Sequence, residues 1–161
     1  MLDDRLALER TGVAPGRQLI LIVEDSDDDF FAMQRAFKKA GLMNPIHRCS
    51  NGDQAADYLF RRGEFAAPDA APRPAIILLD LNLPGLDGRD VLHMVKSDQD
   101  LRRIPVIVLT TSSAPQDIER CYAYGANSYV HKPVDLEGFF QAISRLKDFW
   151  FGIAVLPKEE R

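Results

Sequence analysis

The chain has 161 residues, of which 46% are hydrophobic, and its 24 acidic and 20 basic side chains give a net charge of −4. This length can bury one good core but is too short for two ordinary domains. Because no Lys/Arg cluster appears that could hold a phosphate backbone, nucleic acid is not an expected partner.

Apolar runs and amphipathic stretches then alternate along the chain as repeated strand and helix units. The first strand is predicted at residues 18–24, followed by a helix that Ser26 or Asp27 caps and Gly41 ends. Further strands are predicted at residues 46–49, 76–80, 106–110 and 128–131, and further helices at 51–62, 89–98, 115–124 and from Asp135 onward. The Pro and Ala content of residues 63–74 predicts an exposed insertion.

Five such units with short connections predict an α/β fold. Right-handed crossovers place helices on both faces of a parallel sheet, and the flavodoxin-like (βα)5 three-layer sandwich, with strand order 2-1-3-4-5, is one such arrangement. We assign residues 18–147 to this domain, residues 1–17 to an N-terminal extension and residues 148–161 to an apolar C-terminal extension.

Three carboxylates follow two of the apolar runs. Glu24 and Asp25 close the first run, and Asp80 closes the run at residues 76–79. If the two strands are neighbours, these acids share one pocket at the carboxyl end of the sheet. They stay ionised together only if a cation compensates them, and hard oxygen ligands select Mg²⁺ or Mn²⁺ over zinc. The alternative is that Glu24 and Asp25 only cap the following helix.

Four motifs in order carry a family resemblance. They are Glu24-Asp25, the segment 79–88 (LDLNLPGLDG), Leu109-Thr110-Thr111, and the segment 129–133 (YVHKP). Together they look like the receiver domain of two-component response regulators, over about residues 18–146. Each motif alone is weak, but their joint occurrence in this order is highly specific.

The resemblance implies that Asp80 accepts a phosphoryl group from the phosphohistidine of a sensor histidine kinase. Lys132 would supply the cation that neutralises charge on the phosphoryl oxygens. The resemblance also implies that Glu24, Asp25, Asp80 and the backbone carbonyl of Asn82 hold Mg²⁺ or Mn²⁺. Such a protein is not an enzyme, apart from assisting its own phosphorylation and dephosphorylation.

Further roles follow from the same resemblance. Thr110 and Tyr129 occupy the places of the family's switch pair, and Asn82 and Ser112 are expected to set the lifetime of the acyl phosphate. For Tyr129, an ordinary amphipathic strand residue is the alternative.

Two details concern the ends of the first and last strands. Many relatives carry Asp-Asp where this chain has Glu24-Asp25, so the first acid reaches one methylene farther. The Lys132-Pro133 bond resembles the family's cis peptide, which would aim the ammonium of Lys132 inward.

The C-terminal extension carries more apolar side chains than a minimal receiver domain needs. We predict a homodimer that uses helix 115–124, strand 128–131, the helix from Asp135 and this extension. The predicted dimer residues are Phe149, Trp150, Phe151, Ile153 and Leu156. The alternative is that the extension folds back over the chain's own core.

Few residues follow the last helix, so we expect a single-domain regulator that signals by binding or by relaying phosphate. The insertion at residues 63–74 and the Phe-Trp ending look similar to the regulators paired with bacterial and cyanobacterial phytochromes. Two other classes stay open. A phosphorylation-independent interaction module would be expected to lack Asp80, Lys132 or the acid pair, and all of them are present. A Mg²⁺-dependent phosphatase or phosphotransferase would usually carry a second acid, as general acid/base, at the position of Asn82.

The cysteines and the N-terminus bear on cellular location. Cys49 and Cys121 fit neither a disulfide framework nor metal-ligand spacing, and they indicate reduced thiols in a cytosolic protein. Residues 1–5 lack the apolar core of a signal peptide, and no apolar run reaches membrane-spanning length. We therefore expect a cytoplasmic protein without a membrane anchor.

Overall fold

A computed structural model describes residues 18–157 of the chain. Five parallel strands form one sheet in the order β2-β1-β3-β4-β5, which confirms the predicted flavodoxin-like arrangement. The strands are β1 (Ile20–Val23), β2 (Ile46–Cys49), β3 (Ile76–Leu79), β4 (Val106–Thr110) and β5 (Ser128–His131). The predicted N-terminal extension, residues 1–17, and the last four residues of the C-terminal extension lie outside the described residues.

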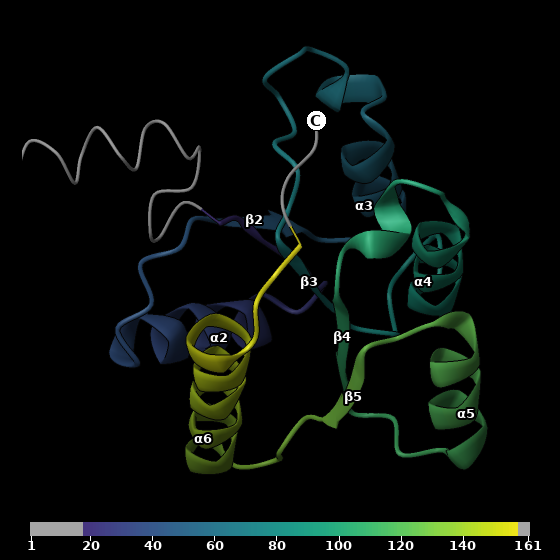
Figure 1. Ribbon diagram of the computed structural model, residues 1–161. Coiled ribbons are helices and arrows are strands. Elements are labelled where there is room, and N and C mark those ends of the chain that lie inside the picture. The colour runs from purple at the N-terminus through teal and green to yellow at the C-terminus, as the bar shows by residue number, and fades with distance from the viewer. Residues whose placement is uncertain (1–17, 158–161) are drawn as a thin grey trace, which may run out of the picture.

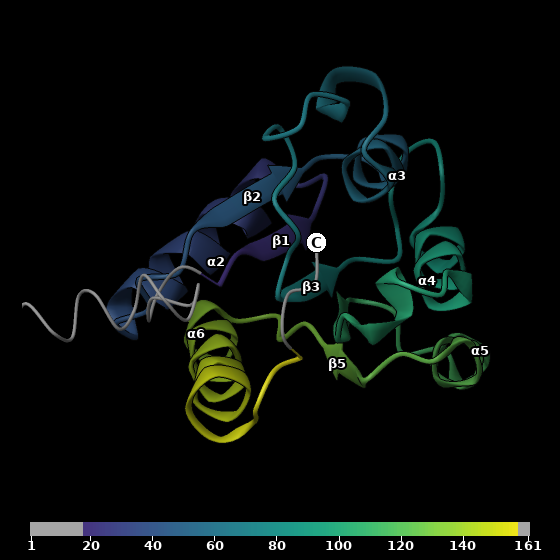
Figure 2. The same cartoon turned by 45° about the horizontal axis from the view of Figure 1, so that its top comes forward.

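Helices cover both faces of the sheet. They are α2 (Asp27–Lys39), α3 (Gly52–Phe60), α4 (Gly88–Ser97), α5 (Pro115–Tyr124) and α6 (Leu136–Lys147), with the short turns η1 (Gly63–Phe65) and η2 (Leu101–Arg103). Figure 1 and Figure 2 show α2 and α6 side by side on one face, while α3, α4 and α5 lie on the other. None of the helices formed by residues 18–157 is long and apolar enough to cross a membrane.

Strands buried on both faces explain the continuous apolar runs of the sequence. Side chains alternate between the faces, so Ile20 and Ile22 pack beneath α2 and α6, whereas Leu21 and Val23 pack beneath α3 and α4. Every residue of β1, β3 and β4 is buried. The sheet therefore separates two hydrophobic cores and holds the strand ends in fixed positions.

Side-chain caps set the starts of most helices. Ser26 caps α2, Asn51 caps α3 and Asp135 caps α6, each accepting a hydrogen bond from a backbone N–H in the first turn. The helix predicted at residues 51–62 ends earlier than expected. Arg61 adopts a left-handed conformation with φ of 54°, which stops α3 at Phe60.

Most residues of the insertion at 63–74 are exposed, as predicted, but some of them are buried. Phe65 is buried and its ring lies 5.1 Å from the ring of Tyr58, centroid to centroid. Arg73 is only 7% exposed, and its Nη1 atom lies 2.7 Å from an Asp100 carboxylate oxygen. The expectation of an exposed insertion was wrong for Phe65 and Arg73, because an edge-to-face aromatic contact and an ion pair hold them against the domain.

The C-terminal extension continues α6 through a π-helical segment, η3 (Asp148–Ile153). Trp150 and Phe151 pack against the core beneath α2 and α6. Phe149 is 48% exposed and Ile153 is 73% exposed, while Leu156 is partly exposed. Folding back on the core therefore accounts for Trp150 and Phe151, whereas Phe149 and Ile153 remain exposed.

Candidate functional site

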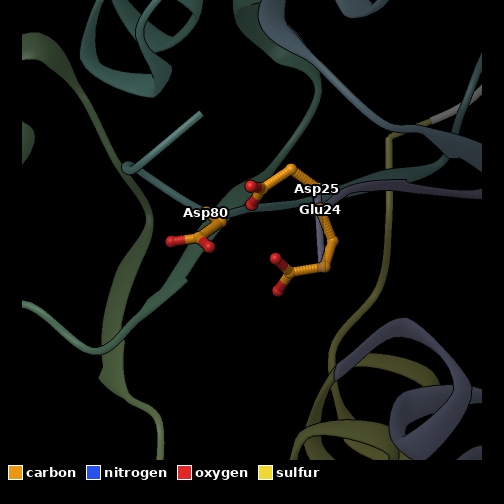
Figure 3. Close-up of side chains that lie close together, drawn as sticks. All are labelled: Glu24, Asp25 and Asp80. Atoms are coloured by element: carbon orange, nitrogen blue, oxygen red, sulfur yellow. The ribbon is translucent and has the colours of Figure 1, made fainter. Parts of the chain in front are cut away.

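The structure brings together the three carboxylates that follow β1 and β3. These strands are neighbours with Val23 opposite Leu79, and the backbone N–H of Asp80 donates to the carbonyl of Val23 at 3.0 Å. One carboxylate oxygen from each of Glu24, Asp25 and Asp80 lies within 4.8 Å of the others. Figure 3 shows the three side chains turned toward a common space at this edge of the sheet.

Lys132 enters this pocket from the end of β5. Its backbone N–H donates to the carbonyl of Thr110 at 2.7 Å, and its side chain is 5% exposed. The ammonium Nζ donates to Glu24, to an Asp29 oxygen at 2.8 Å and to an Asp80 oxygen at 3.2 Å. The sequence pointed to Glu24 and Asp80 as neighbours of this lysine, but it gave no signal for Asp29.

The expected cis bond before Pro133 is absent. No cis peptide bond occurs within residues 18–157, so the bond between Lys132 and Pro133 is trans and that expectation was wrong for this structure. The lysine reaches the pocket acids with the trans bond.

Burial and charge act against each other in this pocket. Burial raises the pKa of Glu24 to about 7, although the hydrogen bond from Lys132 favours its charged form. For Lys132, burial would lower the pKa, but the hydrogen bonds to Asp29 and Glu24 outweigh it and raise the pKa above its usual value. Lys132 therefore stays an ammonium at neutral pH, surrounded by more carboxylates than it can neutralise.

The oxygen donors fit a hard divalent cation. The Asp25 side chain is exposed and, within the described part of the chain, accepts no hydrogen bond or ion pair. Asp80 accepts two long hydrogen bonds, from the Lys132 ammonium at 3.2 Å and from the backbone N–H of Asn82 at 3.4 Å. Glu24 is more occupied, since Lys132 binds one oxygen and the Ser26 N–H donates to the other at 3.3 Å. This donor set, without His or Cys, suits Mg²⁺ or Mn²⁺.

Arg48 on β2 fixes the loop that carries the first two acids. Its guanidinium donates to the carbonyl of Glu24 at 3.0 Å and to the carbonyl of Asp25 at 3.2 Å. It also lies 2.7 Å from an Asp27 carboxylate oxygen. Arg48 carries no signal of this role in the sequence, because an isolated arginine in a strand does not reveal which loop it will contact.

A close backbone approach fixes the loop that follows Asp80. A Cβ atom at Gly88, the first residue of α4, would lie 2.2 Å from the carbonyl oxygen of Asp80 and 2.6 Å from the Cα of Leu81. Only glycine permits this contact between the start of α4 and the end of β3. Gly88 thereby holds the backbone of Asp80 in place.

The predicted switch residues lie on neighbouring strands beside the pocket. Thr110 is fully buried at the end of β4, and its hydroxyl oxygen accepts from the backbone N–H of Ser112 at 3.4 Å. Tyr129 is partly buried, and its hydroxyl donates to the carbonyl of Ser112 at 2.7 Å. Both residues therefore contact the short loop that begins at Thr111.

Ser112 of this loop also contacts an ion pair between α4 and α5. The Ser112 hydroxyl donates to Asp117 at 2.6 Å, and the Arg89 guanidinium binds both oxygens of Asp117 at 2.7 and 2.8 Å. Arg89 also donates to Asp87, the capping residue of α4, at 2.9 Å. The sequence did not indicate this pair, whose members lie far apart in the chain and meet only when α4 packs against α5.

Comparison with known proteins identifies the family. The response regulator receiver domain matches residues 20–144, so the chain belongs to this family. Response regulator Rcp1 of Synechocystis sp. (strain ATCC 27184 / PCC 6803 / Kazusa) is 38% identical over 140 residues, covering 87% of this chain and 93% of that protein. Phosphorylation on an aspartate is a property of the family.

Solved structures agree with the sequence comparison. The phosphorylated cyanobacterial phytochrome response regulator RcpA matches with a TM-score of 0.83 and 39% identity, over 88% of this chain and 99% of that chain. The Mn²⁺-bound form of response regulator Rcp1 also has a TM-score of 0.83, with 38% identity and the same coverage. The expected resemblance to response regulators is thus confirmed, and this chain is homologous to phytochrome response regulators.

Proposed function

We propose that this response regulator accepts a phosphoryl group from a sensor histidine kinase on the carboxylate of Asp80. The observation that carries the proposal is the buried Lys132 ammonium, 3.2 Å from Asp80 in a pocket of clustered carboxylates. A carboxylate oxygen of Asp80 would form a bond to phosphorus as the bond from phosphorus to the kinase's imidazole nitrogen breaks, and the electron pair leaves with that nitrogen.

The surroundings of the three acids favour Asp80 as the nucleophile. Glu24 is fully buried, and its two oxygens already bind Lys132 and the Ser26 N–H. Asp25 is exposed, and it is not among the acceptors Glu24, Asp29 and Asp80 to which the Lys132 ammonium donates. Asp80 combines restricted exposure with contact to the ammonium, which can neutralise charge developing on the phosphoryl oxygens.

We further propose Mg²⁺ as the physiological cation. Asp25, Asp80 and the backbone carbonyl of Asn82 would hold it, with Glu24 as an additional acid. A cation there supplies charge neutralisation for the incoming phosphoryl oxygens. The solved Mn²⁺-bound form of Rcp1 supports a divalent metal in this family. Asn82 and Ser112 are the positions that we propose to set the lifetime of the acyl phosphate.

The signal would leave the pocket through Thr110 and Tyr129. The Thr110 hydroxyl can bond a phosphoryl oxygen, and Tyr129 contacts the same loop through Ser112. The similarity to RcpA supports a sensor kinase of the phytochrome class as the partner. We propose a cytoplasmic regulator. We also propose that it turns over no external substrate, since Asn82 stands where a phosphatase of similar topology would carry an acid.

The exposed apolar side chains of the C-terminal extension support a homodimer. Phe149, Ile153 and Val155 are exposed beyond α6, and Leu136 is exposed at the start of that helix. Trp150 and Phe151 would contribute indirectly, by seating the extension on the core. The test is sedimentation of the wild type beside Phe149→Ser and Ile153→Ser, with Met43→Ser as a control at an exposed site between α2 and β2. We expect only the first two changes to weaken the dimer, and a wild type that is monomeric at micromolar concentration would refute it.

Phosphorylation is tested by intact mass after incubation with Mg²⁺ and a small phosphodonor. We expect one phosphoryl adduct in the wild type and in Asp69→Asn, a change of an exposed acid outside the pocket. Asp80→Asn should carry no adduct, and Lys132→Ala should acquire it slowly or not at all. An adduct that persists in Asp80→Asn would place the acceptor elsewhere. No adduct from any donor, a cognate kinase included, would favour a phosphorylation-independent interaction module.

A further inference from the structure

The ammonium of Lys132 has an acceptor that does not belong to the strand-end acids. Asp29 lies in the first turn of α2, and its carboxylate oxygen is 2.8 Å from Nζ, closer than the Asp80 oxygen at 3.2 Å. The side chain of Asp29 is 42% exposed, whereas those of Glu24 and Asp80 are 1% and 9% exposed. Asp29 therefore contacts the buried lysine from the solvent side.

We propose that Asp29 is a positioning residue that competes with the incoming phosphoryl group for the ammonium of Lys132. This inference rests on the proposed function, in which the phosphoryl group is attached to Asp80. Asp29 acts through Lys132, which it draws toward α2 and away from the phosphoacceptor.

Asp29 and the phosphoryl group must compete because the ammonium of Lys132 has a limited number of N–H donors. A lysine ammonium has three N–H donors, and here they serve Glu24, Asp29 and Asp80. A phosphoryl oxygen beside Asp80 can gain a hydrogen bond from Lys132 only if one of these acceptors loses its own. In the unphosphorylated pocket, all three N–H donors of Lys132 therefore already have an acceptor.

Exposure decides which acceptor is released. Glu24 is buried, so breaking its bond would leave a carboxylate oxygen without a partner and without water. Asp29 is partly exposed, and water can replace the lost bond. Its charge also remains favourable at the N-terminus of α2, where the Ser26 hydroxyl accepts from the Asp29 N–H at 3.2 Å. Release of Asp29 therefore costs less than release of Glu24, and it leaves Lys132 beside Asp80, where the phosphoryl group is attached.

Removing the Asp29 carboxylate should therefore strengthen binding of a phosphoryl group. The test measures the affinity for beryllofluoride, a noncovalent phosphoryl analogue, at saturating Mg²⁺. We expect Asp29→Asn to bind it about five- to tenfold more tightly than the wild type, the effect of one net hydrogen bond to a partly exposed acceptor. Asp29→Ser removes the same carboxylate and should behave alike, which guards against a folding defect in one variant.

Asp28→Asn is the matched control. Asp28 precedes Asp29 in the same helical turn and is exposed, so this change removes the same charge without removing a bond to Lys132. We expect its affinity to change by less than about twofold, because exposed charges are strongly screened. An equal effect of Asp28→Asn and Asp29→Asn would overturn the proposal in favour of net charge.

A double-mutant cycle tests the route through Lys132. In a Lys132→Met background, Asp29→Asn should leave beryllofluoride affinity unchanged. In the wild-type background it should also shift the NMR signal of the Lys132 ε-methylene group, which Asp28→Asn should not do. Affinity that is unchanged or weaker in Asp29→Asn, with wild-type binding intact, overturns this inference alone. A wild type that binds no beryllofluoride and acquires no phosphoryl adduct overturns the proposed function with it.

Discussion

The hydroxyl of Tyr129 donates a 2.7 Å hydrogen bond to the backbone carbonyl of Ser112 and so ties β5 to the loop after β4. The ring packs against the core beneath α3, α4 and α5, and is therefore held inward. The backbone N–H of Tyr129 donates in turn to the hydroxyl of Tyr122 on α5, at 3.1 Å. Tyr129 thus connects the loop beside the acidic pocket to helix α5.

Replacing Tyr129 with Phe should lower the stability of the fold but leave phosphoryl transfer to Asp80 intact. The change leaves the Ser112 carbonyl without this partner, and we expect the free energy of unfolding to fall by about 0.5 to 1.5 kcal/mol in urea denaturation. Because the hydroxyl contacts none of the pocket acids, the mass adduct on Asp80 should still form. Tyr122→Phe, at a more exposed site, is the control and should cost less. Loss of the adduct in Tyr129→Phe would show that the hydroxyl takes part in the chemistry.

The ion pair between Asp117 and Arg89 should make stability depend on acid pH. The hydrogen bonds from Arg89 and Ser112 lower the pKa of Asp117 from the ordinary aspartate value of 3.8 to about 2. A carboxylate whose pKa is lower in the folded state stabilises the fold above its unfolded pKa. That contribution is lost as the pH falls from about 4 toward 2.

Asp117→Asn is the corresponding variant. We expect it to reduce the free energy of unfolding by about 1 to 2 kcal/mol at pH 7, and the difference from the wild type should shrink as the pH falls below 4. Urea denaturation at pH 7 and pH 3 measures both quantities. Asp69→Asn, at an exposed position, should match the wild type at both pH values. A cost of Asp117→Asn that stays constant with pH would refute the ionic origin.

Gly88→Ala should damage the fold and the site together. The added methyl group would meet backbone atoms of Asp80 and Leu81, which cannot move aside as a flexible side chain would. We expect a loss of about 1 to 3 kcal/mol in the free energy of unfolding, and slower phosphorylation of Asp80. Gly152→Ala is the control, since a Cβ atom there would meet nothing within 4 Å. Equal stability of the two variants would contradict the close approach.

Mg²⁺ should stabilise the folded chain through the pocket. A ligand that binds only the folded state at ten times its dissociation constant adds about 1.4 kcal/mol to the free energy of unfolding. Thermal denaturation with Mg²⁺ and with a chelator should reveal this difference in the wild type. We expect it to disappear in Asp25→Asn, which removes an exposed pocket carboxylate, and to persist in Asp69→Asn. An equal response in both variants would place the cation outside the pocket.

Local signals predicted some elements fully. Strand β4 and helix α5 have the predicted bounds, because a buried apolar run defines the first and Pro115 starts the second. The end of α3 could not be predicted, since nothing in the sequence marks Arg61 for a left-handed conformation. The buried position of Arg73 was equally hidden, because it depends on Asp100, a partner from another loop.

The same distinction applies to the site. Glu24, Asp25 and Asp80 were identifiable because they follow apolar strands whose carboxyl ends meet at one edge of the sheet. Asp29 gave no such signal, since an acid in the first turn of a helix is commonly explained by the helix dipole. Its contact with Lys132 depends on how α2 is oriented relative to the end of β5. Contacts of this kind between elements require the folded structure.

The position of Trp150 makes the C-terminal extension optically observable. It is the only tryptophan of the chain, and it is partly buried against the core beneath α2 and α6 with its ring 5.2 Å from that of Phe149. Tryptophan fluorescence therefore reports on the contact between the C-terminal extension and this core. Detachment of the extension would expose the indole and shift its emission to longer wavelength. Fluorescence thus offers an intrinsic, label-free signal for any rearrangement there during phosphorylation or assembly.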